Sequence, residues 1–289
     1  MGLPHILLEP QVEKRNRLNS LEYKSAKTVV RVGDSSIGGD ELAVIAGPCL
    51  IESRAQVFNL AQTVHQGGAK FFCAGAFSTS RMPHATQGLE EEELKILGEV
   101  RGAFGLRIIT EALDERDIEL AAHYADMILI GSHNMQNFSL LRHAARARLP
   151  VILKRSAGAT LEDWLVAAEC LMSEGNYDIV LCESGIRTFN QHTRETLDLA
   201  AIPSIRRLSH LPVIVAPSYS AGKGYMVAPL ACAAIAAGAD GIIVTVGANN
   251  SLQSARADGS ESLAPEQYEQ MILKLHAIYQ LLGAASDSV

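Results

Sequence analysis

Short runs of Val, Ile and Leu alternate with amphipathic stretches along most of the chain. Such runs, almost purely apolar and closed by turn residues, are typical of strands buried on both faces of a parallel sheet. The runs predict strands at 42–47, 69–74, 106–110, 126–131, 150–155, 178–183, 212–216 and 241–246.

The stretches between these runs carry apolar residues at a spacing of three to four, which predicts helices. Thr160 followed by Glu162 and Asp163 is a helix start signal, and glycines such as Gly105 and Gly175 are typical of helix ends. The predicted helices cover residues 54–66, 89–103, 115–124, 138–147, 160–174, 193–208, 226–237 and 265–283.

Strands that alternate with helices at a period of about thirty residues predict an α/β protein with a (β/α)8 TIM barrel at residues 41–289. An open, doubly wound sheet is the alternative, but the short apolar strands and their number favour the closed barrel. Residues 1–40 are predicted to form an N-terminal arm and a short β-hairpin, because 28–32 alternate and 33–40 are turn residues.

Composition narrows the class of protein. The chain has 289 residues, 48% of them hydrophobic, which is enough for a large core. A net charge of -7 without a long basic block argues against nucleic acid, and no apolar run reaches membrane-spanning length. Five cysteines without a CxxC motif, behind a polar N-terminus, indicate a cytoplasmic protein.

The segment Leu153-Lys154-Arg155 points to a site. A buried strand cannot hold an unpaired lysine in its middle, because desolvating the ammonium costs several kcal/mol. The two cations therefore lie at the carboxyl end of their strand, where sites in parallel α/β proteins are built. An ordinary ion pair at a strand end is the alternative interpretation.

Several of the other predicted strands also end in small or polar residues, whereas the loops at the opposite ends are shorter. This asymmetry favours a site at the carboxyl face. The end segments are 47–49, 73–77, 110–111, 131–134, 154–155, 183–187, 217–219 and 245–247.

These motifs resemble the DAHP synthase and 3-deoxy-manno-octulosonate 8-phosphate synthase family, and most closely its Iβ-type DAHP synthases. The matching segments are 45–49 with Glu52-Ser53, 134–138, 153–155, 181–183 with 185–189, 208–213 and 257–259. The resemblance implies a barrel closed below by a hairpin, a homodimer or homotetramer, and condensation of phosphoenolpyruvate with a phosphorylated aldose. It also implies a divalent metal in the DAHP synthases.

The chain departs from the family at the metal site. The resemblance implies a cysteine, a histidine, a glutamate and an aspartate, and here these positions hold Cys49, Tyr219, Thr245 and Asp258. Since preformed divalent sites need three or four donors, no cofactor is predicted, although a weak divalent metal at Cys49 and Asp258 stays open.

The chain also departs from the family where anionic substrates bind. Neutral residues or His133 replace arginines and a lysine of the family at positions 73, 78, 80, 133 and 184. Each charge-assisted contact contributes about 1.5–3 kcal/mol, and micromolar binding corresponds to about 8 kcal/mol. The lost contacts therefore predict weak binding of phosphoenolpyruvate in the family manner.

Three residues are candidates for catalysis: Lys154, Glu183 and His133. With few cations around it, Lys154 is expected to have a lowered pKa, which suits proton transfer or an imine. Glu183 is expected to act as a base or to pair with Lys154, and His133 to bind an anion or exchange a proton. The predicted substrate-binding residues are Arg155, Asn134, Gln136, Arg81, Ser184, Arg187, Tyr219, Thr245, Cys73, Cys49 and Asp258.

The predicted function is an enzyme with altered, metal-independent aldol-type or C–C/C–O bond chemistry. Its substrate would be a small enolpyruvyl, shikimate-pathway or sugar-acid carboxylate, and secondary metabolism is one setting for it. A catalytically silent homologue that binds a metabolite or a partner synthase is the second interpretation. A true 3-deoxy-7-phosphoheptulonate synthase with an unorthodox site is the third interpretation. The loss of several cationic contacts to the substrates argues against it.

Overall fold

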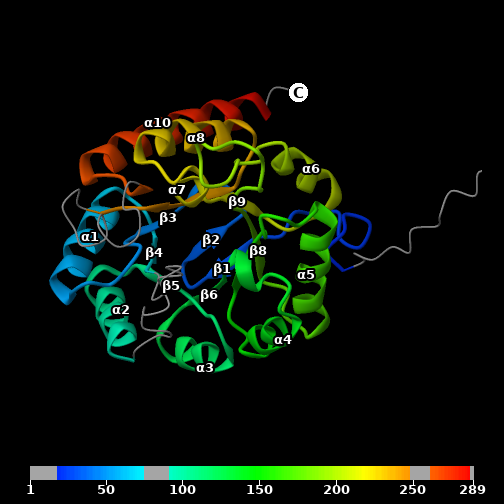
Figure 1. Cartoon of the computed structure of the whole chain (residues 1–289), viewed down its shortest axis with the longest axis horizontal. Helices are drawn as coiled ribbons and strands as arrows, with labels where there is room; N and C mark the ends of the chain where they lie inside the picture. The colour runs from blue at the N-terminus through cyan, green and yellow to red at the C-terminus, as the bar shows by residue number, and fades with distance from the viewer. Residues whose placement is uncertain (1–17, 75–90, 248–260, 287–289) are drawn as a thin grey trace, which may run out of the picture.

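The computed structural model describes residues 18–74, 91–247 and 261–286 and contains a closed, parallel eight-stranded barrel. The first and last strands close it, with Gly241 opposite Ala43 and Thr245 opposite Gly47. The predicted TIM barrel is confirmed (Figure 1). Its strands are β3 (Ala43–Gly47), β4 (Phe71–Cys73), β5 (Arg107–Glu111), β6 (Met127–Ile130), β7 (Val151–Lys154), β8 (Ile179–Glu183), β9 (Val213–Val215) and β10 (Gly241–Thr245).

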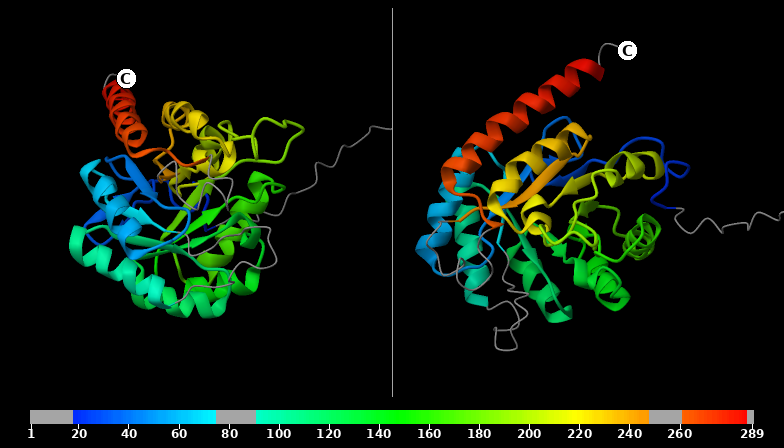
Figure 2. Two further views of the ribbon diagram at one scale, coloured as in Figure 1. Left: turned by 60° about the vertical axis from the view of Figure 1, so that its left-hand side comes forward. Right: turned by 45° about the horizontal axis from the view of Figure 1, so that its top comes forward.

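Helices surround the barrel as an outer ring, and the long C-terminal helix α10 runs beside α8 (Figures 1 and 2). None of the helices within the described ranges has the length and apolar character needed to cross a bilayer. The helices that follow the strands are α1 (Arg54–Gln66), α2 (Glu91–Phe104), α3 (Glu115–Tyr124), α4 (Phe138–Arg146), α5 (Leu161–Ser173), α6 (Ala201–Leu208), α8 (Gly224–Ala236) and α10 (Pro265–Ser286).

Side chains of each strand divide between two cores, because successive residues of a strand point to opposite faces. In β7, Val151 and Leu153 pack outward against the helices, whereas Ile152 packs inside the barrel. The same alternation in β8 places Leu181 outside and Val180 inside. It decides which strand-end residues reach the barrel mouth.

A β-hairpin closes the amino end of the barrel. Its strands are β1 (Val30–Val32) and β2 (Ser35–Ile37), and Val30, Val32 and Ile37 belong to the interior core. The Asp34 carboxylate pairs with Arg107, which begins β5, at 3.0 Å. The hairpin was predicted, but β2 lies inside the predicted turn segment, because Gly33 at φ 62° and Asp34 alone reverse the chain.

The predicted helix at 193–208 is wrong in its first half, since α6 begins only at Ala201. Residues before it pair with other segments: Thr196 bridges Ile186, and the Glu195 amide donates to the Ser220 carbonyl. The chain also forms a short helix that the pattern did not indicate, α7 (Pro217–Ala221), after β9.

The described part of the N-terminal arm lies against the outer helices. The Asn19 side chain donates to the Leu165 carbonyl at 2.7 Å, and the Leu18 amide donates to the Glu169 carboxylate. Residues 1–17 lie outside the described part of the chain.

Substitution of Thr160 with alanine is expected to lower the free energy of unfolding by about 1 kcal/mol. Thr160 caps α5 reciprocally: its Oγ1 accepts from the Asp163 amide at 3.1 Å, and the Asp163 carboxylate accepts from the Thr160 amide at 3.0 Å. Thermal unfolding should show a midpoint a few degrees lower, and Thr160→Ser should keep the wild-type midpoint. An unchanged midpoint in Thr160→Ala would contradict the assigned cap.

Candidate active site at the carboxyl mouth of the barrel

Five strand-end residues face the barrel interior at its carboxyl mouth, and we call them the mouth layer. Each continues the inward-facing register of its strand, as Lys154 follows the interior residue Ile152. The mouth layer consists of Cys73 on β4, Glu111 on β5, Lys154 on β7, Cys182 on β8 and Thr245 on β10.

Lys154 is the cation of the mouth layer. Its Nζ lies 5.5 Å from the centroid of the Tyr219 ring. Burial by itself would lower the pKa of Lys154, but the electrostatic effects of Glu111, Cys182, Cys73 and Tyr219 together outweigh it, so the pKa is raised above its ordinary value. The expected lowering is therefore wrong in direction, because the expectation did not place the Glu111 carboxylate near Lys154.

Glu111 was not among the predicted site residues. Burial raises the pKa of its carboxyl above the ordinary value, although the charges of Lys154 and His133 oppose the shift. Gly131 makes room for this side chain, since a Cβ there would lie 2.0 Å from the Glu111 Oε1 atom. Counting inward-facing positions along β5 from Ile109 would have identified Glu111.

His133 and its neighbours form a rim beside Glu111. His133 is exposed on a single turn of 3-10 helix, η1 (Ser132–Asn134), close enough to Glu111 to affect its pKa. The Asn134 side chain donates to the Leu113 carbonyl at 3.2 Å, which holds the turn against the barrel. Gln136 is exposed on the same rim.

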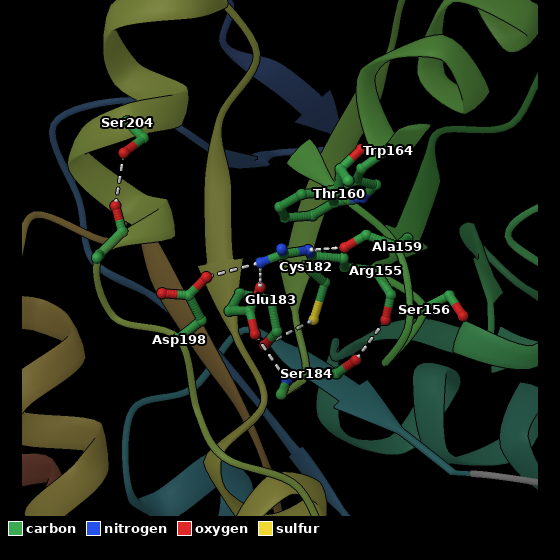
Figure 3. A network of polar contacts seen from close by, with 12 residues as sticks. Arg155, Ser156, Ala159, Thr160, Trp164, Cys182, Glu183, Ser184, Asp198 and Ser204 are labelled. Carbon is green, nitrogen blue, oxygen red and sulfur yellow. Dashed lines mark hydrogen bonds and ion pairs between the residues drawn. The ribbon is translucent and has the colours of Figure 1, made fainter. Parts of the chain in front are cut away.

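Glu183 and Arg155 meet each other rather than Lys154. Arg155 Nη1 lies 3.0 Å from both the Glu183 Oε2 and the Asp198 Oδ2 atoms (Figure 3). Glu183 Oε1 accepts from the Gly185 amide at 2.7 Å, and Arg155 Nε donates to the Ala159 carbonyl. Glu183 shares the outward register of Leu181, so the expected Glu183–Lys154 pair is not formed.

Two further predicted binding residues are engaged elsewhere. The Ser184 hydroxyl is buried and donates to the Arg155 carbonyl at 2.9 Å (Figure 3). Arg187 is exposed and lies 3.6 Å from the Glu195 carboxylate. The structure brings neither side chain into the mouth layer.

The thiols at the mouth are protonated at neutral pH. Burial raises the pKa of Cys49 to about 11, with further help from the charge of Glu261, and raises that of Cys73 and Cys182 to about 12. Since the thiolate is both the nucleophile and the metal ligand, these cysteines are suited to lining the pocket.

Within the described part of the chain, the donor set does not fit a divalent metal. Tyr219 and Thr245 offer a phenol and an aliphatic hydroxyl in place of the histidine and glutamate that the resemblance implies, which leaves Cys49 as the one described residue of that set that matches. Among residues 18–74, 91–247 and 261–286, no group of three His, Cys, Asp or Glu side chains could hold a metal ion. Asp258 and Arg81 lie outside the described residues.

Arg194 is a second cation at the mouth that the sequence did not indicate. Its Cζ lies 5.2 Å from the centroid of the Tyr219 ring, and its Nη2 lies 2.5 Å from the Glu261 carboxylate. No local pattern could have identified it, because residue 194 was assigned to a helix and reaches the mouth only through tertiary pairing.

The mouth therefore combines two fixed cations on one aromatic ring with an acid of raised pKa. Lys154 and Arg194 can bind anionic groups, and the Glu111 carboxyl, whose pKa is raised by burial, can exchange a proton. This chemistry suits a small anionic substrate with a carbonyl or enol carbon.

Comparison with known proteins gives close matches over nearly the whole chain. Residues 19–282 match the family described as "DAHP synthetase I family". A phospho-2-dehydro-3-deoxyheptonate aldolase of Thermotoga maritima is 41% identical over 273 residues, covering 94% of this chain and 80% of the relative. A 2-dehydro-3-deoxyphosphooctonate aldolase of Syntrophobacter fumaroxidans is 26% identical and covers 86% of this chain and 90% of its own.

Solved structures of DAHP synthases also match this chain over most of its length. A truncated 3-deoxy-D-arabino-heptulosonate 7-phosphate synthase from Thermotoga maritima superposes with a TM-score of 0.86 at 40% identity, over 93% of this chain and 98% of the other. A longer structure of the Thermotoga maritima DAHP synthase gives a TM-score of 0.89 at 42% identity, over 94% and 79%.

These matches overturn the predicted altered chemistry on an enolpyruvyl, shikimate-pathway or sugar-acid carboxylate. A chain that is 41% identical over 94% of its length to a phospho-2-dehydro-3-deoxyheptonate aldolase favours the third interpretation over the first. The earlier count of lost cations considered only the positions of the family pattern. It could not include Arg194, which the tertiary structure brings to the mouth.

Proposed function

Because the chain belongs to the DAHP synthetase I family, we propose that it is a 3-deoxy-7-phosphoheptulonate synthase. It would condense phosphoenolpyruvate with erythrose 4-phosphate and release inorganic phosphate, as a biosynthetic enzyme of the shikimate pathway acting as a homo-oligomer. The observation that carries the proposal is 41% identity over 94% of the chain to a relative with the corresponding name.

The proposed reaction joins the enol carbon of phosphoenolpyruvate to the aldehyde carbon of the aldose. The aldehyde oxygen gains a proton, water adds to the central carbon of phosphoenolpyruvate, and the C–O bond to phosphate breaks. Water supplies both the hydroxyl group and the proton, so no oxidant or reductant is needed.

The mouth residues have properties that each of these steps requires. The Lys154 ammonium, kept charged by Glu111, would hold the carboxylate or phosphate at the reacting carbon. The Glu111 carboxyl, whose pKa is raised by burial, would exchange a proton with the adding water or the new alkoxide. His133 lies where its charge affects Glu111 and would modulate that exchange.

We include metal independence in the proposal, because a phenol (Tyr219) and a hydroxyl (Thr245) stand where the resemblance implies histidine and glutamate ligands, and no group of three His, Cys, Asp or Glu side chains among the described residues could hold a metal ion. When bound in the family, a divalent ion would supply electrophilic activation of the aldehyde. In this chain, fixed cations such as Lys154 are the groups that could stabilise developing negative charge there.

Phosphate release from phosphoenolpyruvate plus erythrose 4-phosphate is expected to proceed at an enzymatic rate, and EDTA is expected to leave that rate unchanged. Added Mn²⁺ should not increase it. The measurement is a continuous phosphate assay, with product confirmed by mass spectrometry and arabinose 5-phosphate as the alternative aldose. Absence of phosphate release with either aldose would refute the proposed activity, and complete loss with EDTA would refute metal independence alone.

A further inference from the structure

The guanidinium of Arg194 is held at the mouth by three separate contacts. Its Nη1 donates to the Tyr219 carbonyl at 3.2 Å, its Nη2 pairs with Glu261 at 2.5 Å, and its Cζ lies 5.2 Å from the centroid of the Tyr219 ring. The Arg194 side chain nevertheless keeps 27% of its surface exposed, whereas Glu261 keeps 8%. The guanidinium is therefore oriented, and the Arg194 side chain is not fully buried.

The backbone around Arg194 is fixed as well. Its amide donates to the Ala221 carbonyl, and its Cβ packs against Gly222, where a Cβ would lie 3.3 Å away. Gly222 has φ of 63°, which suits glycine and lets α7 end beside this segment. Because the position is rigid, a ligand that binds there would lose little affinity to ordering of the protein.

Arg194 and Lys154 act on the same small region. Both lie over the Tyr219 ring, and both affect the pKa of Cys49, which burial and Glu261 raise. Two cations on one ring can contact two anionic groups of one small substrate, or of two substrates side by side.

The chemistry of arginine indicates what kind of anion it would take. A guanidinium presents five N–H donors in a planar fork that matches the oxygens of a phosphate, and contacts to the described residues engage only two of its nitrogens. The ammonium of Lys154, which lies over the same Tyr219 ring, would add a second positive charge for the same anion. A phosphorylated substrate is therefore the favoured ligand.

We propose that Arg194 is a substrate-contacting residue that binds a phosphoryl group, with Glu261 limiting its strength. The inference rests on the proposed function for the source of that group, which is either phosphoenolpyruvate or the phosphorylated aldose. Glu261 competes with the phosphate for the same guanidinium, so removing its charge would strengthen phosphate binding.

The test compares Arg194→Gln, Arg194→Lys and Glu261→Gln with the wild type by steady-state kinetics. Arg194→Gln is expected to raise the KM for one phosphorylated substrate about tenfold or more, with a smaller change in kcat. The substrate whose KM rises identifies the source of the phosphate. Arg194→Lys should recover part of the loss, and Glu261→Gln should lower the same KM.

The opposite changes in KM expected for Arg194→Gln and Glu261→Gln separate a substrate-contacting role of Arg194 from a structural one. If Arg194 only anchors the loop through Glu261, both Gln variants will break the same ion pair and move KM in the same direction, which would overturn the proposal. Arg54→Gln is the matched control, because Arg54 lies 4.4 Å from the centroid of the Phe58 ring and pairs with Glu99 at 2.6 Å on the outside of the barrel. Its KM should equal that of the wild type.

Calorimetric titration with phosphoenolpyruvate and inorganic phosphate keeps the test independent of turnover. If the wild type binds either compound and Arg194→Gln weakens that binding about tenfold, the inference stands even where no heptulosonate is formed. If Arg194→Gln fails to fold, Glu261→Gln decides by the sign of its effect. Equal affinity in all variants, or no binding of any phosphorylated compound to the wild type, would overturn it.

Discussion

Lys154→Met is expected to reduce kcat/KM for the condensation by about 1,000-fold or more. The substitution removes the ammonium from the mouth layer while keeping a side chain of similar length. A charged contact to the substrate and the stabilisation of developing negative charge would both be lost, and the second alone contributes about 10²–10³-fold. Steady-state phosphate release at saturating and limiting substrate measures the effect.

Lys95→Met is the control for this substitution, since Lys95 lies on the outer helix α2 and pairs only with neighbouring Glu91 and Glu92 among the described residues. Its kcat/KM should match the wild type. Wild-type kcat/KM in Lys154→Met would show that the assigned role is wrong.

The raised pKa of Lys154 gives this prediction a pH dependence. Its ammonium is stabilised by Glu111, so Lys154 stays charged up to and beyond the ordinary lysine value of about 10.4. Substrate affinity that depends on the Lys154 charge is therefore expected to stay constant as pH rises through 8 and 9. For the same reason, borohydride in the presence of erythrose 4-phosphate, whose aldehyde could form an imine, should leave Lys154 unmodified, because a protonated amine forms no imine.

Glu183→Ala is expected to destabilise the fold by about 3–5 kcal/mol, the largest stability effect among these predictions. The substitution leaves the buried Arg155 guanidinium with only the partly exposed Asp198 as its charged partner. It also removes the acceptor of the Gly185 amide, which orders the loop after β8. Chemical denaturation should show a lower midpoint with an unchanged slope.

The double substitution Arg155→Leu with Glu183→Leu separates charge from packing. Replacing both partners removes the uncompensated buried charge, so the double variant should be more stable than Glu183→Ala. Glu183→Gln should be intermediate, because the amide oxygen can still accept from Gly185. A Glu183→Ala midpoint equal to that of the wild type would contradict the assigned ion network.

Much of the fold was predictable because it depends on local periodicity. Apolar runs such as 150–155 are unfavourable in contact with water and are therefore buried. The amphipathic stretches between them have only one apolar face. The barrel follows from these repeats. The site was predicted less completely: Lys154 was found from the cost of burying an ammonium within a strand, whereas Glu111 and Arg194 were missed.

Register and long-range pairing account for these differences. Arg155 and Glu183 looked like site residues because they end their strands, but the register of β7 and β8 turns them outward into a buried ion network. Arg194 lies in a segment that its own pattern predicted as helix. Backbone hydrogen bonds to α7 keep that segment out of α6, and they position the Arg194 guanidinium against the Tyr219 ring.

The sequence by itself determined the barrel, the closing hairpin, the family resemblance and one reactive cation, since each depends on apolar spacing, turn chemistry or a local motif. Only the tertiary structure decided which strand ends face the mouth and which charges meet there. Electrostatic partners such as Glu111 for Lys154 and Glu261 for Arg194 are far apart along the chain. Their interaction depends on distance in space, which no local pattern encodes.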